Sequence, residues 1–233
     1  MFNNSDNSLT TFNSQGKLLQ VEYAKIASCS SNTIIILKTK KNAIMAIKNN
    51  QDNHIEMPFF GSKIFLINKK IGIGGAGLFQ DIRMLVKRAR NHCVSFKYSF
   101  GEEISIRQLA RDLAGFVQEF TQTGGVRPFG ASLILMGFEE DGPDIYQIDP
   151  SGTFIRIKIT AIGNKANTIK KFLLKRKTKN LNLKDSLNLI SLAVQKTFEC
   201  DTHQLNLQFA VTNESCFFKI LTSSDLKVIQ KPI

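Results

Sequence analysis

The stretch SLTTFNSQGKLLQVEYA, residues 8–24, begins as a polar, turn-like segment and becomes amphipathic after Gly16. It contains two adjacent threonines, Thr10 and Thr11. Some hydrolases use a threonine at a processed N-terminus as the nucleophile, with its own amine as the base. The segment therefore raises the question of whether one of these threonines is catalytic, and the rest of the chain has to answer it.

Length and composition indicate a soluble globular protein. The chain has 233 residues, of which 42% are hydrophobic, and a chain of this size can bury about 70–75% of its extended surface. Its four cysteines lie far apart, without CxxC or metal-ligand spacing, so we expect reduced thiols. The first residues, MFNNSDNS, do not resemble a secretory signal, and no apolar stretch approaches the ~20 residues of a membrane span. We therefore expect an intracellular protein.

Apolar runs predict two antiparallel hairpins in the first third of the chain. The runs Thr33–Lys38 and Ala43–Lys48 form one pair, and Lys63–Asn68 and Ile71–Gly75 form the other. The polar segment 49–61 between them ends in residues typical of a loop.

The remainder alternates between helix pairs and strands. Helical spacing of apolar residues predicts helices with the faces Ile82, Leu85, Val86, Ala89 and Ile106, Leu109, Ala110, Leu113, Val117, Phe120, and two more at Lys165–Lys177 and Leu183–Phe198. Further strands are predicted at Ala131–Phe138, Asp144–Asp149, Thr153–Lys158, 205–211 and Cys216–Ile220, followed by a short helix capped at 222–225. Strands and helix pairs in this order favour an α+β domain with antiparallel sheets over a doubly wound fold.

Three separated motifs carry a resemblance to a known family. They comprise Phe12, Gly16, Leu18 and QVEYA (20–24), then GGVRPFG (124–130), then DPSG (149–152). In this order they resemble the 20S proteasome alpha-type subunits over nearly the whole chain. The resemblance implies a four-layer αββα sandwich of two antiparallel sheets flanked by helix pairs, which is the N-terminal-nucleophile hydrolase fold, with an extra N-terminal helix. It also implies a single alpha-type domain over 1–233, with a gate segment at 1–16 and the N-terminal helix at 17–28.

The resemblance implies a structural role in a protease complex. Alpha-type subunits are non-catalytic: they form a seven-membered ring, cap the ring of beta-type subunits, gate substrate access and bind the tails of activators during ubiquitin-dependent protein degradation. The implied partners are other alpha-type subunits, beta-type subunits and a regulatory ATPase particle, with no cofactor, metal, membrane or nucleic acid. The implied location is the cytoplasm and the nucleus.

The resemblance also implies which residues carry these roles. Leu18, Leu19, Tyr23 and Ile26 form an apolar surface on a helix that crosses the end of the strand sandwich at the ring interface. The implied gate and ring-interface residues are Thr11, Phe12, Gly16, Leu19, Gln20, Glu22 and Tyr23. Lys63 and Leu78 correspond to the pocket that receives activator tails. Where the family's tails usually carry a tyrosine, an aspartate and a proline, this chain has Ser5, Asp6 and Ser14.

The family also supplies a test for the two threonines. Catalytic beta-type subunits need an aspartate about 16 residues and a lysine about 32 residues after the threonine to activate it. Counted from Thr10 these positions are Ile26 and Asn42, and counted from Thr11 they are Ala27 and Ala43. The sequence therefore predicts no catalytic threonine, and an active threonine hydrolase is the first alternative.

Two other patterns have both a functional and an ordinary structural interpretation. Gly72, Gly74 and Gly77 form a GxGxxG motif, but the strands before it form a hairpin and no acidic residue lies between Asp81 and Glu102 to hold a ribose. We interpret these glycines as sites of close packing. The basic run over 170–179, in a chain of formal net charge +12, is typical of a solvated helix face, and a basic RNA-binding protein is the second alternative. The three histidines lack companions at metal-ligand spacing.

Overall fold

The structure, a computed structural model, describes residues 10–48, 63–176, 178, 180–199, 207–214, 217–222 and 225–226. The loop predicted at 49–61 lies outside these residues, as do Ser5, Asp6, Leu205 and Cys216.

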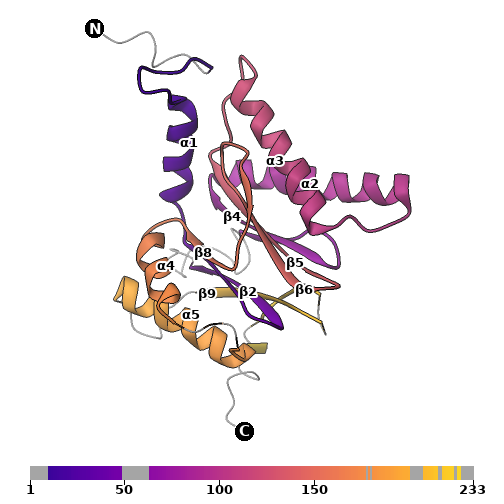
Figure 1. Ribbon diagram of the computed structural model, residues 1–233, viewed down its shortest axis with the longest axis vertical. Coiled ribbons are helices and arrows are strands. Elements are labelled where there is room, and N and C mark those ends of the chain that lie inside the picture. Colours follow the sequence, from indigo (N-terminus) through magenta and orange to yellow (C-terminus); the bar gives the residue numbers. More distant parts are fainter. Residues whose placement is uncertain are drawn as a thin grey trace, which may run out of the picture.

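Within the described residues, two five-stranded antiparallel sheets form the centre of the molecule (Figure 1). The first has the order β10-β9-β2-β1-β8 and consists of β1 (Ile34–Lys38), β2 (Asn42–Lys48), β8 (Ile159–Ile162), β9 (Leu207–Asn213) and β10 (Lys219–Ile220). The second has the order β3-β4-β5-β6-β7 and consists of β3 (Ile64–Leu66), β4 (Ile71–Gly77), β5 (Ala131–Glu139), β6 (Gly142–Ile148) and β7 (Phe154–Arg156). Both predicted hairpins are confirmed, because β1 pairs with β2 and β3 with β4.

Helix pairs cover the outer faces of the two sheets. Helices α2 (Phe79–Phe100) and α3 (Ile106–Gln122) pack on the second sheet, and α4 (Ala166–Leu174) and α5 (Leu183–Phe198) pack on the first. Figure 1 shows these layers, with α1 (Leu19–Cys29) standing beside them near the N-terminal end of the described chain. The predicted αββα sandwich with an extra N-terminal helix is confirmed.

Alternation along the central strands assigns their side chains to different layers. In β1, Ile34 and Ile36 lie in the core between the two sheets, whereas Ile35 and Leu37 pack under α4 and α5. Successive side chains of a strand point to opposite faces, and both faces of this strand are covered. A strand buried on both faces therefore has a continuous run of apolar residues in its sequence, as β1 does at positions 34–37.

The GxGxxG segment forms most of β4, which is buried along its whole length. A β-carbon on Gly74 would collide with the sulfur of Met45 in the facing sheet, and one on Gly75 would lie 2.5 Å from the side chain of Ile82 in α2. The strand is antiparallel to both of its neighbours, so no βαβ unit is present here. The interpretation of these glycines as close-packing sites is confirmed.

One predicted strand was wrong in extent, and one strand was missed. The pattern predicted a single strand over Thr153–Lys158, but β7 ends at Arg156 and a separate β8 follows in the other sheet. The N–H of Ile157 donates to the Ile145 carbonyl in the second sheet (3.0 Å), while the carbonyl of Lys158 accepts from the N–H of Lys38 in the first (2.8 Å). The chain thus changes sheets between two consecutive residues, without a Gly or Pro to mark the crossing.

Local signals define several helix ends. The Ser105 side chain accepts a hydrogen bond from the N–H of Gln108 (3.2 Å) at the start of α3, and Gly101 ends α2 at φ 74°. The predicted cap at 222–225 is confirmed, since Asp225 Oδ2 accepts from the N–H of Thr222 (2.9 Å) and Thr222 Oγ1 from the N–H of Asp225 (3.4 Å). Helix α4 ends at Leu174, before the predicted end at 177.

Replacement by alanine should have opposite effects at Gly152, which contacts α3, and at Gly115, which lies within α3. Gly152 adopts φ +81°, and a β-carbon there would lie 2.5 Å from Gln118 Cβ and 2.7 Å from the Ala114 carbonyl oxygen. Gly152→Ala should therefore lower the free energy of unfolding by about 1–3 kcal/mol. Gly115 lies within α3 with open space around it, so Gly115→Ala should raise the free energy by about 0.5–1 kcal/mol. Urea denaturation followed by circular dichroism measures both, and equal midpoints for the two variants would contradict the packing described for the 149–152 turn.

Candidate functional site

The inner face of α1 is attached to the second sheet. Val21, Ala24 and Ser28 are the buried residues of this helix. The Ser28 hydroxyl donates to the carbonyl of Lys25 (2.8 Å) and accepts from the hydroxyl of Ser132 in β5 (3.0 Å), so a buried polar contact fixes the helix against the sheet.

The segment before α1 forms the turn that the sequence predicted at Gly16. Asn13 Oδ1 accepts from the N–H groups of Gln15 (3.0 Å) and Lys17 (2.9 Å), and the N–H of Gly16 donates to the Asn13 carbonyl (2.9 Å). Gly16 adopts φ 73°, which few other residues tolerate. This turn sets the direction in which the chain enters α1.

The outer side of α1 is apolar and exposed. Tyr23 is 51% exposed and Ile26 is 61% exposed, while Leu18 and Leu19 are half-buried. Phe12, in the segment before the helix, is 66% exposed. Leu19, Tyr23 and Ile26 follow i, i+4, i+7 spacing and so share one side of the helix. The predicted apolar surface is present, and within the described residues nothing covers its two most exposed members.

The structure brings Lys63 and Leu78 together through Gly77. Lys63 Nζ donates to the Gly77 carbonyl (2.9 Å), and the next residue, Leu78, is 45% exposed. Burial lowers the pKa of the Lys63 ammonium from its ordinary value. The N–H of Gly77 donates to the hydroxyl of Ser31, which follows α1 (2.7 Å). Lys63 and Leu78 therefore lie beside the C-terminal end of α1.

The GGVRPFG motif (124–130) is hydrogen-bonded to the first turn of α2 and to the backbone of Leu78. Arg127 makes two hydrogen bonds to the carboxylate of Asp81, at 2.7 and 2.8 Å, and Asp81 Oδ2 also accepts from the N–H of Gly130 (2.8 Å). The Gly130 carbonyl in turn accepts from the N–H of Leu78 (2.9 Å). Phe129 packs with the rings of α3. The motif thus holds the backbone at Leu78 in place.

Asp81 was not predicted as a site residue from the sequence. Its side chain is only 8% exposed, and burial alone would raise its pKa, but hydrogen bonds from Arg127 and Gly130 and the charge of Arg127 hold the pKa below its ordinary value. The sequence showed only that Asp81 is an acidic residue in the first turn of a predicted helix, where acidic residues are generally favourable. Nothing in the local pattern indicated that its partner would be Arg127, 46 residues later.

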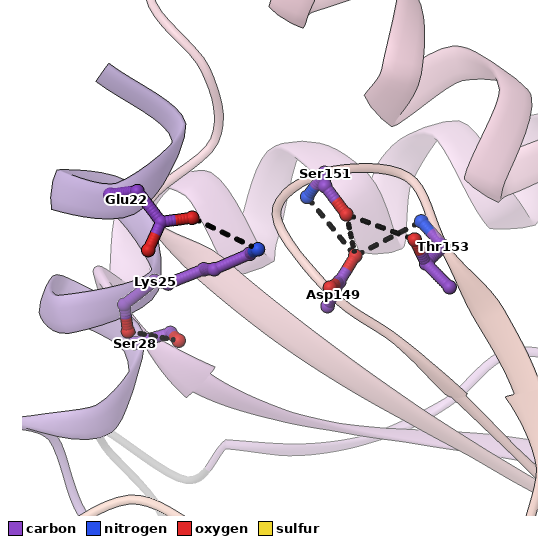
Figure 2. A network of polar contacts seen from close by, with 6 residues as sticks. All are labelled: Glu22, Lys25, Ser28, Asp149, Ser151 and Thr153. Atoms are coloured by element: carbon purple, nitrogen blue, oxygen red, sulfur yellow. Dashed lines mark hydrogen bonds and ion pairs between the residues drawn. The ribbon is translucent and has the colours of Figure 1, made fainter. Parts of the chain in front are cut away.

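The DPSG motif is a turn closed by its own aspartate. Figure 2 shows Asp149 Oδ1 accepting from the N–H of Ser151 (3.1 Å), the hydroxyl of Ser151 (2.6 Å) and the N–H of Thr153 (3.0 Å). The same view includes Lys25 of α1, which pairs with Glu22 at 3.2 Å. Asp149 and Lys25 both line a cavity of about 350 Å³ that also touches β5, β6, β8 and the start of α4. The turn therefore forms one wall of the space beside α1.

Among the described residues, the positions that would have to activate Thr10 or Thr11 carry neither an aspartate nor a lysine. Both threonines are exposed, and the positions that would have to supply an aspartate and a lysine hold Ile26 or Ala27 on α1 and Asn42 or Ala43 at the start of β2. The described part of the chain also contains no cluster of His, Cys, Asp or Glu able to bind a metal ion. His92 pairs with Asp112 of α3 at 2.8 Å. In the same part of the chain, no helix has the length and apolarity to cross a bilayer.

Comparisons with known proteins agree with the motifs. A family described as "Proteasome subunit" matches residues 29–212, and the N-terminal signature of A-type proteasome subunits matches residues 6–27. The alpha type-2 proteasome subunit of Dictyostelium discoideum is 38% identical over 220 residues, 94% of each chain. A probable alpha type-2 proteasome subunit of Neurospora crassa is 41% identical over 194 residues (82% of this chain, 78% of the relative), and the alpha type-2 proteasome subunit of Caenorhabditis elegans is 36% identical over 216 residues (91% and 92%).

The Asp81–Arg127 contact predicts a defined pH dependence of stability. The folded state holds the Asp81 pKa below its unfolded value of about 3.9, so the contact stabilises the fold fully above that pH and is lost as the pH falls through the folded-state pKa. Asp81→Asn should lower the free energy of unfolding by about 2–3 kcal/mol at pH 7. The free energy of unfolding of this variant should also decrease less than that of the wild type as the pH is lowered. Urea denaturation between pH 7 and pH 3 tests this, with Asp141→Asn at an exposed position as the control. Equal acid sensitivity of Asp81→Asn and the wild type would contradict the assignment.

Proposed function

Because this chain belongs to the proteasome subunit family and carries its alpha-type signature, we propose that it occupies one position of the alpha ring of the 20S core particle as a non-catalytic subunit. In that position it caps the beta-type ring and takes part in gating substrate access. The observation that carries the proposal is the two-sided α1, with Val21, Ala24 and Ser28 buried against the protein's own sheet and Tyr23 and Ile26 exposed on the outside.

The proposal includes that this chain does not itself hydrolyse peptides. A terminal threonine needs its amine to be uncharged and close to the hydroxyl, which requires a nearby cation to lower the amine pKa and a carboxylate to orient the group. Ile26, Ala27, Asn42 and Ala43 provide neither charge. A protein with this sequence contributes to proteolysis by arranging the complex, and the catalytic threonines belong to beta-type partners.

The ring interface is assigned to the segment 11–23. Its members are Thr11, Phe12, Gly16, Leu19, Gln20, Glu22 and Tyr23. Phe12 and Tyr23 present large, exposed rings, and aromatic residues contribute strongly to interface cores. A neighbouring alpha-type subunit is the partner that would cover this side of α1.

Activator docking is assigned to Lys63 and Leu78. The Lys63 ammonium is half-buried, and within the described residues it donates a hydrogen bond to a neutral carbonyl. A terminal carboxylate of a regulatory ATPase tail would supply a negative charge, while Leu78 would contact an apolar side chain of the tail. A role in ubiquitin-dependent protein degradation, in the cytoplasm and the nucleus, is part of the same proposal.

Shortening the outer side of α1 should impair assembly. Leu19→Ala combined with Tyr23→Ala removes apolar surface from the proposed interface, and the loss of packed apolar side chains costs about 2–5 kcal/mol. Native mass spectrometry and gradient sedimentation should show reduced incorporation into core particles. Leu192→Ala, at a partly exposed position on α5, is the control and should assemble as the wild type does. Normal incorporation of the double variant would remove α1 from the proposed interface.

Removing the Lys63 ammonium should weaken tail binding and leave the ring intact. A charge-assisted hydrogen bond contributes about 1.5–3 kcal/mol, so Lys63→Ala should weaken binding of an activator tail peptide to the assembled particle by about tenfold or more at this pocket. Lys69→Ala, an exposed lysine in the β3–β4 turn, is the matched control. Unchanged cross-linking of the tail to this chain in Lys63→Ala particles would show that Lys63 is only a structural residue, while loss of assembly would show that it supports the fold.

A further inference from the structure

The segment 150–184 carries positive charge without any acidic residue. It contains ten Lys and Arg and no Asp or Glu: Arg156, Lys158, Lys165, Lys170, Lys171, Lys175, Arg176, Lys177, Lys179 and Lys184. Since the whole chain has 31 basic and 19 acidic residues, this segment departs strongly from the average. The middle of the segment is α4.

Helix α4 directs its lysines away from the protein. Ile169 and Leu173 are its buried residues and pack in the core under α4 and α5. At 100° per residue, Lys170, Leu174, Lys171 and Lys175 occupy the sector that faces away from this core, and all four are exposed. Leu174 is 59% exposed and lies between the lysines. These four residues are called the α4 basic surface below.

Cations next to α4, on α5 and on β2 lie over aromatic rings. Arg176 lies 3.6 Å from the ring centre of Phe172, and Lys196 of α5 lies 5.9 Å from the same ring. A second ring, Phe198, has two lysines near it, Lys48 at 4.0 Å and Lys165 at 5.1 Å.

Carboxylates do not neutralise the α4 basic surface within the described part of the chain. None of its three lysines forms one of the ion pairs found there. The acidic residues of the neighbouring α5 are Asp185 in its first turn and Glu199 at its C-cap, and neither takes part in an ion pair with α4. Positive potential therefore accumulates over the outer side of α4.

We propose that the α4 basic surface binds an acidic segment of another protein, in which carboxylates flank an apolar side chain that contacts Leu174. Charge complementarity favours an anion, because the three adjacent lysines form no ion pair with another described residue. An exposed leucine among them is matched by a peptide that alternates acidic and apolar residues. A phosphodiester backbone offers Leu174 no apolar contact.

The two phenylalanines also argue against a single-stranded nucleic acid as the ligand. Such ligands are held by stacking of bases on exposed aromatic rings. Phe172 is covered by Arg176 at 3.6 Å, and both Phe172 and Phe198 are only partly exposed. The proposal goes beyond the ring position proposed above and does not depend on it.

The test uses the purified full-length chain and a fluorescent peptide in which glutamates flank leucines. Binding should be measurable by fluorescence anisotropy at low salt and should weaken as salt is added. Replacing Lys170, Lys171 and Lys175 together by Gln should weaken binding by about tenfold or more. The control replaces Lys40, Lys41 and Lys69 by Gln, which removes the same charge from exposed positions elsewhere, and its affinity should stay near that of the wild type.

A second variant separates a specific peptide site from general attraction of anions. Leu174→Gln should weaken binding of the peptide and leave binding of an oligouridylate of equal charge unchanged. The proposal is overturned if the two lysine variants bind the peptide equally, because binding would then follow net charge alone. It is also overturned if the oligouridylate binds the wild type more tightly than the peptide does, since the surface would then be a nucleic-acid site.

Discussion

The contact between the two sheets is the constraint on which the rest of the structure depends. Each sheet is covered on one face by the other sheet and on the opposite face by a helix pair, so its central strands have no side that faces water. This explains why β1 is apolar at four consecutive positions and why β4 consists largely of glycine. Met45 and Ile82 approach β4 from opposite sides, and only a strand without β-carbons at Gly74 and Gly75 leaves room for both.

The same requirement fixes the candidate site. At the end of β4, Gly77 lies against the backbone of Gly130, where a β-carbon would collide with the carbonyl oxygen. The two strands can therefore approach closely, and Asp81 then reaches Gly130 and Arg127 from the first turn of α2. Lys63 and Leu78 are consequently held by backbone atoms whose positions are set by sheet packing.

Sequence pattern predicted elements well where one periodicity extended over many residues and poorly where the partner was distant. The faces of α2 and α3 and both early hairpins followed from local spacing. The break between β7 and β8 did not, because Ile155, Ile157 and Ile159 continue one alternation while the hydrogen-bonding partner changes from one sheet to the other. Asp81 was missed for the same reason, since its partner is remote in sequence. Lys63 and Leu78 were predicted through the family resemblance, and local pattern alone would have favoured an ordinary edge lysine.

The two sides of α1 have different environments: one side is buried against the second sheet, and the other is apolar and exposed. The helix lies beside the end of the sandwich, and Ser28 on its inner side uses its hydroxyl to bond Ser132 of β5. Both hydroxyls are buried, so this hydrogen bond contributes to holding α1 against the sheet. The cavity beside α1 is lined by side chains of the helix itself, including Lys25 and Cys29. Attachment of α1 therefore places a fixed helical surface at the sheet ends, and the exposed Tyr23 and Ile26 lie on the outer side of that surface.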